Sequence, residues 1–262
     1  MYKIFISTFG KKVIKVKHSE PIEVGAALRN NFIYPLEDNT GNNISPENTF
    51  YGELTGLYWI WKNGNISDND IIGFCHYNKA LDISEQKATQ WLEKNPKGMI
   101  TLLPGKIRNH PVPDECNAVF NSLQKGELKY LEACRKLFDN ELASKYPNNR
   151  GASMFICRGE TFKAYCSWLF PLLSEVRKIV GDKPDAEPYW KRYCAYIAER
   201  LLSVYIEANH LPALGVKVRL KKWWIPILGK LRKVSGISKK NKIYQLLYYK
   251  LGYHSSYKKN GK

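Results

Sequence analysis

One short stretch of the sequence gathers residues that can move protons or bind anions. His76, Tyr77, Asn78 and Lys79 follow one another directly after the apolar run 71–75. An imidazole can act as a base or as a metal ligand, and a phenol beside a lysine can contact a diphosphate or a sugar. A single histidine at the end of a strand is more often a structural residue, so both interpretations stand.

Two glutamates in helical stretches are further candidates. Glu53 lies between apolar helical positions, where its carboxylate could act as a base or neutralise a buried lysine. Glu199 is followed by Arg200 and points away from the apolar stripe of its helix. This pair therefore faces either a cleft or water, and a solvated pair is the more common arrangement.

A loop rich in asparagine precedes the first of these helices. The segment 36–43 reads LEDNTGNN, and Ser45 and Pro46 follow it. Serine is a good N-cap and proline suits the first helical position, so we expect one helix from here to about residue 63. The N–H groups of a helix start favour an anion, whereas Asp38 could hold a sugar hydroxyl. A plain turn that caps the helix is the alternative.

Several familiar motifs are absent from the sequence. There is no Walker phosphate loop, no G-x-G-x-x-G and no G-x-S-x-G. The one Asp-x-Asp spacing, Asp68 to Asp70, precedes a predicted strand, whereas a metal-binding pair of this kind should follow one. We interpret it as a turn and assign no metal ligands, which leaves a requirement for Mg²⁺ or Mn²⁺ open.

The elements that must position these residues alternate along the chain. Strands are predicted at 2–8, 71–77, 98–103 and 152–157, and helices at 46–63, 86–94, 123–142, from 161 onward, and 188–208. Segment 104–117 is predicted to be a loop, and 11–17 to continue or pair with the first strand. Alternating strands and helices predict an α/β fold, in which ligands bind at the carboxyl ends of strands. The loop 38–45 and the segment 76–79 should meet there.

Charge divides the chain into two parts. The 262 residues carry 41 Lys or Arg and 24 Asp or Glu, a net charge of +17. Residues 217–262 contain 14 of the basic residues and no acid, so residues 1–216 carry only +3 (27 basic minus 24 acidic). We therefore predict a globular domain over 1–216 and a separate, mostly helical basic tail over 217–262.

The tail combines cations with aromatic side chains, which is typical of segments that bind an anionic membrane surface. We prefer this partner to nucleic acid or to a solvated extension without a partner. The residues expected at the membrane are Lys221, Lys222, Trp223, Trp224, Lys230, Arg232 and Lys233.

Cysteine usage and hydropathy bear on location. The six cysteines are scattered without a Cys-x-x-Cys spacing, which favours reduced, buried thiols over disulfides or a zinc site. The N-terminus lacks a signal peptide, and no apolar run approaches 18 residues. These features indicate a cytoplasmic protein.

Five blocks of the sequence resemble a bacterial family of capsular and exopolysaccharide glycosyltransferases that was catalogued as a domain of unknown function. The blocks are DNTGNNIS (38–45), ENTFYGELTGLYWIWKN (47–63), IIGFCHY (71–77), MFICRGETFKAYCSWLF (154–170) and YIAERLL (196–202). They occur in the family's order over about residues 1–210, and the second block is the most specific.

The resemblance implies a Rossmann-like, A-type-like nucleotide-sugar glycosyltransferase domain. It implies transfer of a sugar, with galactose the best candidate, from a UDP-sugar to a polyprenyl-diphosphate-linked glycan in capsule, exopolysaccharide or O-antigen synthesis. The enzyme would then sit peripherally on the inner face of the cell membrane. The implied catalytic residues are Glu53 and His76, and Glu199 and Arg200 would line the acceptor cleft. The implied donor-binding residues are Asp38, Asn43, Ser45, Trp59, Lys62, Tyr77, Asn78 and Lys79.

The sequence departs from the family at one place. The family usually follows its His-Tyr pair with two arginines, whereas Asn78 and Lys79 stand here. Lysine does not reproduce the forked hydrogen bonding of arginine, so Asn78 and Lys79 would bind a diphosphate more weakly than two arginines. This departure favours the alternative of a non-catalytic, sugar-nucleotide-binding or glycan-binding component of an assembly complex.

Overall fold

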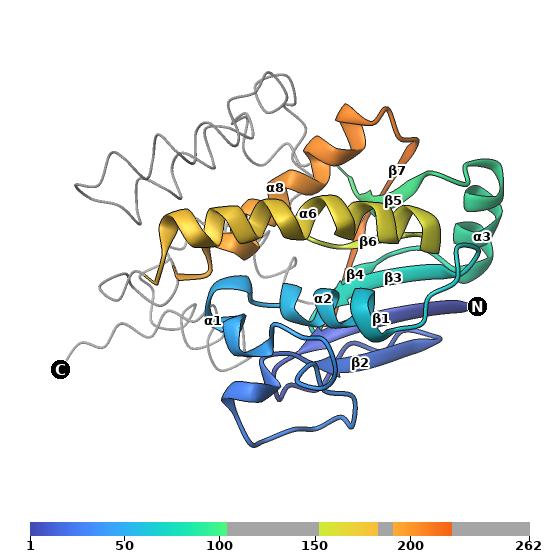
Figure 1. Ribbon diagram of the computed structural model, residues 1–262. Helices are drawn as coiled ribbons and strands as arrows, with labels where there is room; N and C mark the ends of the chain where they lie inside the picture. The colour runs from blue at the N-terminus through green and yellow to red at the C-terminus, as the bar shows by residue number, and fades with distance from the viewer. Residues whose placement is uncertain (104–151, 183–190, 222–262) are drawn as a thin grey trace, which may run out of the picture. The chain divides into compact units, whose positions relative to one another are not determined.

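The computed structural model describes residues 1–103, 152–182 and 191–221 (Figure 1). The chain divides into two compact units, Met1–Lys221 and Lys222–Lys262, and the described residues all belong to the first. The predicted loop 104–117, the predicted helix 123–142 and most of the predicted membrane residues lie outside the described residues. Those membrane residues are Lys222, Trp223, Trp224, Lys230, Arg232 and Lys233.

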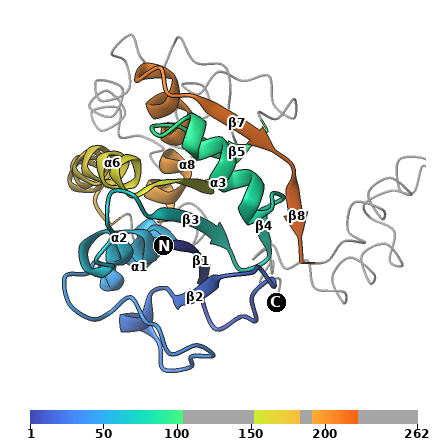
Figure 2. The same ribbon diagram turned by 90° about the vertical axis from the view of Figure 1, so that its right-hand side faces the viewer.

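The centre of this unit is an eight-stranded sheet (Figure 2). Its main path runs in the order β2, β1, β3, β6, β5, β7, and β4 and β8 extend it from β3. Only β6 runs against its neighbours on the main path, so β1, β2, β3, β5 and β7 all end at one edge. The strands are β1 (Tyr2–Thr8), β2 (Ser19–Glu23), β3 (Ile71–His76), β4 (Lys79–Leu81), β5 (Met99–Leu102), β6 (Phe155–Arg158), β7 (Ala213–Val216) and β8 (Val218–Leu220).

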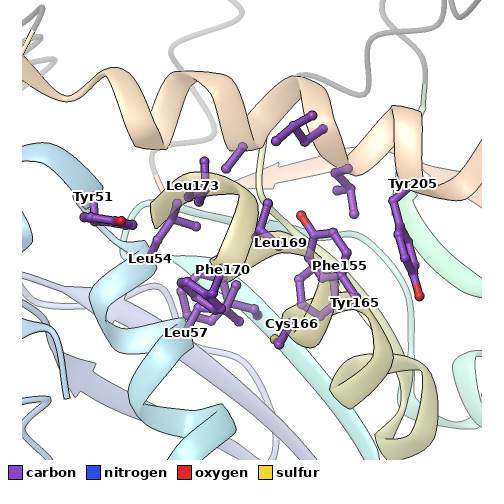
Figure 3. Packing of buried hydrophobic residues seen from close by; sticks show 14 of the residues in the cluster. Tyr51, Leu54, Leu57, Phe155, Tyr165, Cys166, Leu169, Phe170, Leu173 and Tyr205 are labelled. Atoms are coloured by element: carbon purple, nitrogen blue, oxygen red, sulfur yellow. The ribbon is translucent and has the colours of Figure 1, made fainter. Parts of the chain in front are cut away.

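Helices cover both faces of the sheet. The helices α2 (Leu54–Asn63), α6 (Gly159–Val180) and α8 (Tyr193–Ala208) share one core with Phe5, whereas α3 (Glu85–Lys94) shares another with Ile4 and Ile6. Successive side chains of a strand point to opposite faces, which explains why neighbours in β1 belong to different cores. In Figure 3, Leu169 and Leu173 of α6 lie with the α2 leucines. This packing buries the apolar stripe of each helix.

The predicted single helix over 46–63 is wrong. The chain forms the short helix η2 (Ser45–Glu47), then α1 (Asn48–Tyr51), and after a break α2. Gly52 causes the break because its φ of 54° and ψ of −130° cannot continue a helix. Ser45 is the first residue of η2 rather than an N-cap, and its hydroxyl bonds elsewhere.

Four short strands and the C-terminal boundary of the unit also differ from expectation. The short strands β2, β4, β7 and β8 were not predicted, and 11–17 forms no strand. Because β8 pairs with β4, the expected division after residue 216 falls between two strands of one sheet. The compact unit instead continues to Lys221. Within the described ranges, no helix is long and apolar enough to cross a bilayer.

Candidate functional site

His76 ends β3 at the edge where the parallel strands finish. It pairs with Lys79 of β4, so Tyr77 and Asn78 form the turn between the two strands. The side chain of His76 is only 13% exposed, and its Nε2 lies 4.0 Å from Oε1 of Glu53. Among the described residues, Nε2 has no hydrogen-bond partner. A buried ring nitrogen without a partner can accept a proton from a bound molecule.

Glu53 faces His76 because the chain breaks at Gly52 just before α2. Its carboxylate is buried, and Oε2 accepts a 2.7 Å hydrogen bond from Nη2 of Arg192. A Cβ on Gly52 would lie 2.5 Å from that Nη2. Glycine therefore serves two purposes here, since it allows the positive φ and leaves room for the guanidinium.

The start and the middle of α8 complete the cluster. Arg192 immediately precedes α8, and Glu199 and Arg200 lie two turns later. Glu199 Oε2 accepts a 2.9 Å hydrogen bond from Nη1 of Arg200, which also donates to the carbonyl of Tyr196. The charges of Glu53, Lys79 and Arg192 all act on Glu199, which places it in the same charged group.

Burial and neighbouring charges fix the protonation states. Burial alone would raise the pKa of Glu53, but its neighbours His76, Arg192 and Lys79 outweigh burial and lower that pKa. Burial, aided by Lys79 and Arg192, lowers the pKa of His76 to about 4. At neutral pH the site therefore holds an anionic Glu53 beside a neutral imidazole.

The pKa of Glu199 is shifted in the opposite direction from that of Glu53. Burial and then the negative charge of Glu53 raise its pKa to about 7, although Arg200, Lys79 and Arg192 counteract them. A carboxyl that titrates near neutrality can both give and accept a proton. The cluster thus contains a carboxylate, a neutral base, a titrating carboxyl and three cations.

Asp38 has a different environment from the one expected. It is fully buried, and its oxygens accept hydrogen bonds from the N–H groups of Gly25 and Ala26 at 2.9 and 3.0 Å. The hydroxyl of Ser45 donates to it at 2.5 Å and accepts from the N–H of Ala27. Asp38 and Ser45 therefore hold the turn after β2 rather than face an open cradle.

The other expected donor-binding residues fix loops. Asn43 accepts from the N–H of Ser45, and the indole of Trp59 donates to both oxygens of Thr40 at 3.0 Å. The ammonium of Lys62 lies 3.5 Å from the ring centroid of Trp61. The carbonyl of Asn78 accepts from the N–H of Lys221. Donor binding by these residues stays a prediction.

The structure therefore divides the expected site residues into two sets. It brings together Glu53, His76 and Lys79 with the pair Glu199 and Arg200. The remaining residues lie in the loop 37–45, in the β3–β4 turn or on α2, where Lys62 lies over the ring of Trp61. Sequence reasoning missed Arg192. Its spacing of seven residues from Glu199 puts both on one face of a helix, and that signal could have identified it.

Metal ligands do not gather in the described ranges. Among residues 1–103, 152–182 and 191–221, no group of three or more His, Cys, Asp or Glu side chains could hold a metal ion. Asp70 accepts from the N–H of Ser67 at 2.9 Å within the turn before β3. Asp68 pairs with Lys163.

Comparisons with known proteins identify both a family and a fold. The family model described as "Domain of unknown function (DUF4422)" matches residues 3–210. A comparison with curated proteins gave no match. A solved structure, the apo form of the bifunctional glycosyltransferase WbbM, is similar with a TM-score of 0.62 and 21% identity. The match covers 84% of this chain and 45% of WbbM, so the chain spans less than half of that protein's length. The likeness shows that the chain has the mixed α/β, Rossmann-like fold of that structure.

Proposed function

The chain belongs to the DUF4422 family, and from that premise we propose that it is a glycosyltransferase. It moves a sugar from a nucleotide-sugar donor to a hydroxyl group of a glycan acceptor. Fold alone does not establish function, because one fold carries many activities. The proposal therefore depends on the site at the end of β3.

The observation that carries the proposal is the pairing of Glu53 with His76. The two side chains are buried, 4.0 Å apart, and lie where ligands bind in α/β sheets. His76 is neutral at pH 7 and has a free Nε2, so it can take a proton. The carboxylate of Glu53 would stabilise the imidazolium that results.

The reaction we propose is a direct displacement at the anomeric carbon. The acceptor oxygen forms a bond to that carbon while the bond from the carbon to the diphosphate oxygen breaks. The bonding electron pair leaves with the nucleoside diphosphate, and the acceptor's proton moves to His76 Nε2. Such a displacement inverts the anomeric configuration and requires a base, which the site supplies.

The negative charge of the leaving diphosphate requires stabilisation. Arg192 is 42% exposed although it holds Glu53, so its guanidinium can also contact a ligand. Lys79 lies in the same charged group. Preorganised cations stabilise charge that develops during a reaction. We therefore assign the diphosphate to Arg192 and Lys79, and the cation at Lys79 compensates in part for the arginines that usually follow the His-Tyr pair.

The finer identity of the substrates is part of the same proposal. We propose a UDP-hexose, with galactose the first candidate, as donor and a polyprenyl-diphosphate-linked glycan as acceptor. The five sequence blocks that resemble polysaccharide glycosyltransferases support this choice. The acid-free stretch 217–262 supports a location on the inner face of an anionic membrane.

Release of nucleotide tests the proposal. Purified protein is incubated with a panel of nucleotide sugars and a water-soluble glycan acceptor, with and without Mg²⁺, and nucleoside diphosphate is measured. We expect His76→Ala to lower kcat by about 10²-fold or more, the usual contribution of a general base. His18→Ala is the matched control because His18 is half exposed and lies outside the cluster.

The contradicting results are clear. Full activity of a folded His76→Ala protein would remove the base from the proposal. Release of no nucleotide from any donor, combined with stabilisation of the protein by a nucleotide sugar in a thermal shift, would favour the non-catalytic binding component instead.

A further inference from the structure

Four large hydrophobic side chains are exposed on two loops after β1 and β2. They are Phe9 (49% exposed), Leu28 (54%), Phe32 (36%) and Ile33 (47%). The described residues contain only seven exposed side chains of this kind, so most of them are concentrated in these loops. We call these four residues the Phe9 surface. Such a concentration usually marks a binding surface.

A buried carboxylate holds the two loops together. Glu23 accepts hydrogen bonds from the N–H groups of Gly10 and Ile33, both at 2.8 Å, and from the guanidinium of Arg29. Arg29 in turn lies over the ring of Phe32, 5.1 Å from its centroid. The burial of Glu23 and its bonds to both loops fix the Phe9 surface as one structured unit.

Cations lie beside this surface. Lys11, Lys12 and Lys15 are exposed on the segment that continues from Phe9. The guanidinium of Arg219 donates to the carbonyl of Lys15 at 3.0 Å, and the ammonium of Lys221 bonds to the carbonyl of Lys12. Among the described residues, no carboxylate forms an ion pair with Lys11, Lys12 or Lys15, whereas Lys17 lies near Glu85.

The Phe9 surface also adjoins the candidate site. The ring of Phe9 contacts the ring of Tyr77 edge to face, with centroids 5.2 Å apart. Tyr77 follows His76 directly in the β3–β4 turn. A molecule held against Phe9 would therefore lie within reach of the proposed base.

From this arrangement we infer that the Phe9 surface docks the folded domain on an anionic lipid bilayer. Apolar side chains enter the interface while neighbouring lysines reach the headgroups, which is how peripheral surfaces bind such membranes. Lys221, the last residue of the compact unit, lies on the same side, and Lys222, Trp223 and Trp224 follow it in the sequence. The inference extends the proposed function, because a lipid-linked acceptor would then reach His76 from the membrane.

A dye attached to the Phe9 surface tests direct contact with lipid. Ile33→Cys and, as control, Lys97→Cys are labelled with an environment-sensitive fluorophore in full-length protein that carries Cys116→Ser and Cys134→Ser. The four other cysteines are buried. Lys97 lies just before β5, at the end of the sheet where the parallel strands begin, whereas the Phe9 surface lies at the end where they finish. We expect a blue shift at position 33, and none at 97, on vesicles of phosphatidylcholine with phosphatidylglycerol.

Binding of the full chain to the same vesicles gives the second readout. We expect Phe9→Ser combined with Ile33→Ser to lower the partition coefficient by about tenfold, because two apolar side chains no longer enter the lipid. Lys12→Glu combined with Lys15→Glu should have a similar effect. Lys94→Glu combined with Lys97→Glu makes the same change in net charge on the opposite edge and should change binding by less than about twofold.

The outcomes separate this inference from its rivals. Vesicle binding without a blue shift at position 33 would assign membrane binding to residues 222–262 alone and overturn the inference. A change in oligomeric state on substitution of Phe9 and Ile33, without loss of vesicle binding, would assign the surface to a second copy. Sugar transfer to a water-soluble acceptor is measured in parallel. If the wild-type protein transfers no sugar, the proposed function is overturned, whereas the docking inference is not.

Discussion

Two glutamates in one charged cluster have pKa values shifted in opposite directions, and the reason is the difference in their neighbours. Glu53 lies against Arg192 and His76, which lower its pKa despite burial. Glu199 is influenced first by burial and then by the charge of Glu53, and its pKa rises to about 7. Carboxyls whose environments drive their pKa values apart are the usual basis for separate acid and base roles.

The raised pKa of Glu199 predicts a specific dependence of stability on pH. The folded protein keeps a proton on Glu199 up to about pH 7, whereas the unfolded chain loses it near 4.5. The contribution of Glu199 to stability is therefore present below pH 4.5 and lost as pH rises toward 7. Relative to Glu199→Gln, the wild type should lose on the order of 3 kcal/mol of unfolding free energy across this window.

Urea denaturation at several pH values measures this difference. His76 contributes an opposing trend, since its pKa of about 4 makes stability rise between pH 4 and 6.5. Both proteins keep His76, so the comparison cancels that trend. Glu93→Gln, at an exposed position on α3, should give a curve parallel to the wild type. Parallel curves for Glu199→Gln as well would mean that Glu199 is solvated.

At the scale of elements, the break between α1 and α2 decides where the cluster forms. Gly52 adopts a φ of 54° and lies against the guanidinium of Arg192. An uninterrupted helix over 46–63 would carry Glu53 on a different path. The non-helical geometry at Gly52 therefore places the carboxylate of Glu53 next to Arg192 at the start of α8.

Substitution of two glycines can separate backbone strain from the contact with Arg192. Gly52→Ala and Gly181→Ala both place a side chain at a positive φ, but nothing lies within 4 Å of a Cβ at Gly181. In each variant, backbone strain should lower the free energy of unfolding by about 1 kcal/mol or more. The free energy of unfolding of Gly52→Ala should fall by at least about 1 kcal/mol more, because this substitution also disturbs the ion pair between the buried Glu53 and Arg192. Equal losses in urea denaturation would show that the contact contributes nothing.

At the scale of the whole molecule, the boundary between domain and tail is structural rather than electrostatic. The charge change begins at residue 217, yet β8 pairs with β4 and the compact unit ends at Lys221. Basic residues therefore lie on both sides of the boundary. The Phe9 surface and the acid-free segment would then act on the same membrane.

Two truncations test this boundary. A chain that ends at Lys221 should keep a cooperative thermal transition within a few degrees of the full-length Tm, because every described strand is retained. A chain that ends at Val216 loses β8 and the bond from Lys221 to the carbonyl of Asn78, so its Tm should fall clearly. Circular dichroism during heating measures both. Identical transitions would place the boundary at residue 216, where the charge changes.

The sequence by itself determined the α/β class, the strands β1, β3, β5 and β6, the helices α3, α6 and α8, and the charge asymmetry. These properties follow from local hydrophobic periodicity and from composition, which any stretch of chain displays before it folds. It also selected Glu53 and His76 as candidates for proton transfer because of their residue types, and Glu199 as a residue that could line a cleft. The short strands β2, β4, β7 and β8 and the break at Gly52 carried too little local signal to be predicted.

Only the tertiary structure decided what these residues are near. Glu53 meets Arg192 across 139 positions of sequence, and Asp38 is enclosed by the backbone N–H groups of Gly25 and Ala26. The charge state of a carboxyl depends on its burial and on the charges within a few ångströms. Folding creates both the burial and these neighbouring charges, so the local sequence around a carboxyl could not predict its charge state.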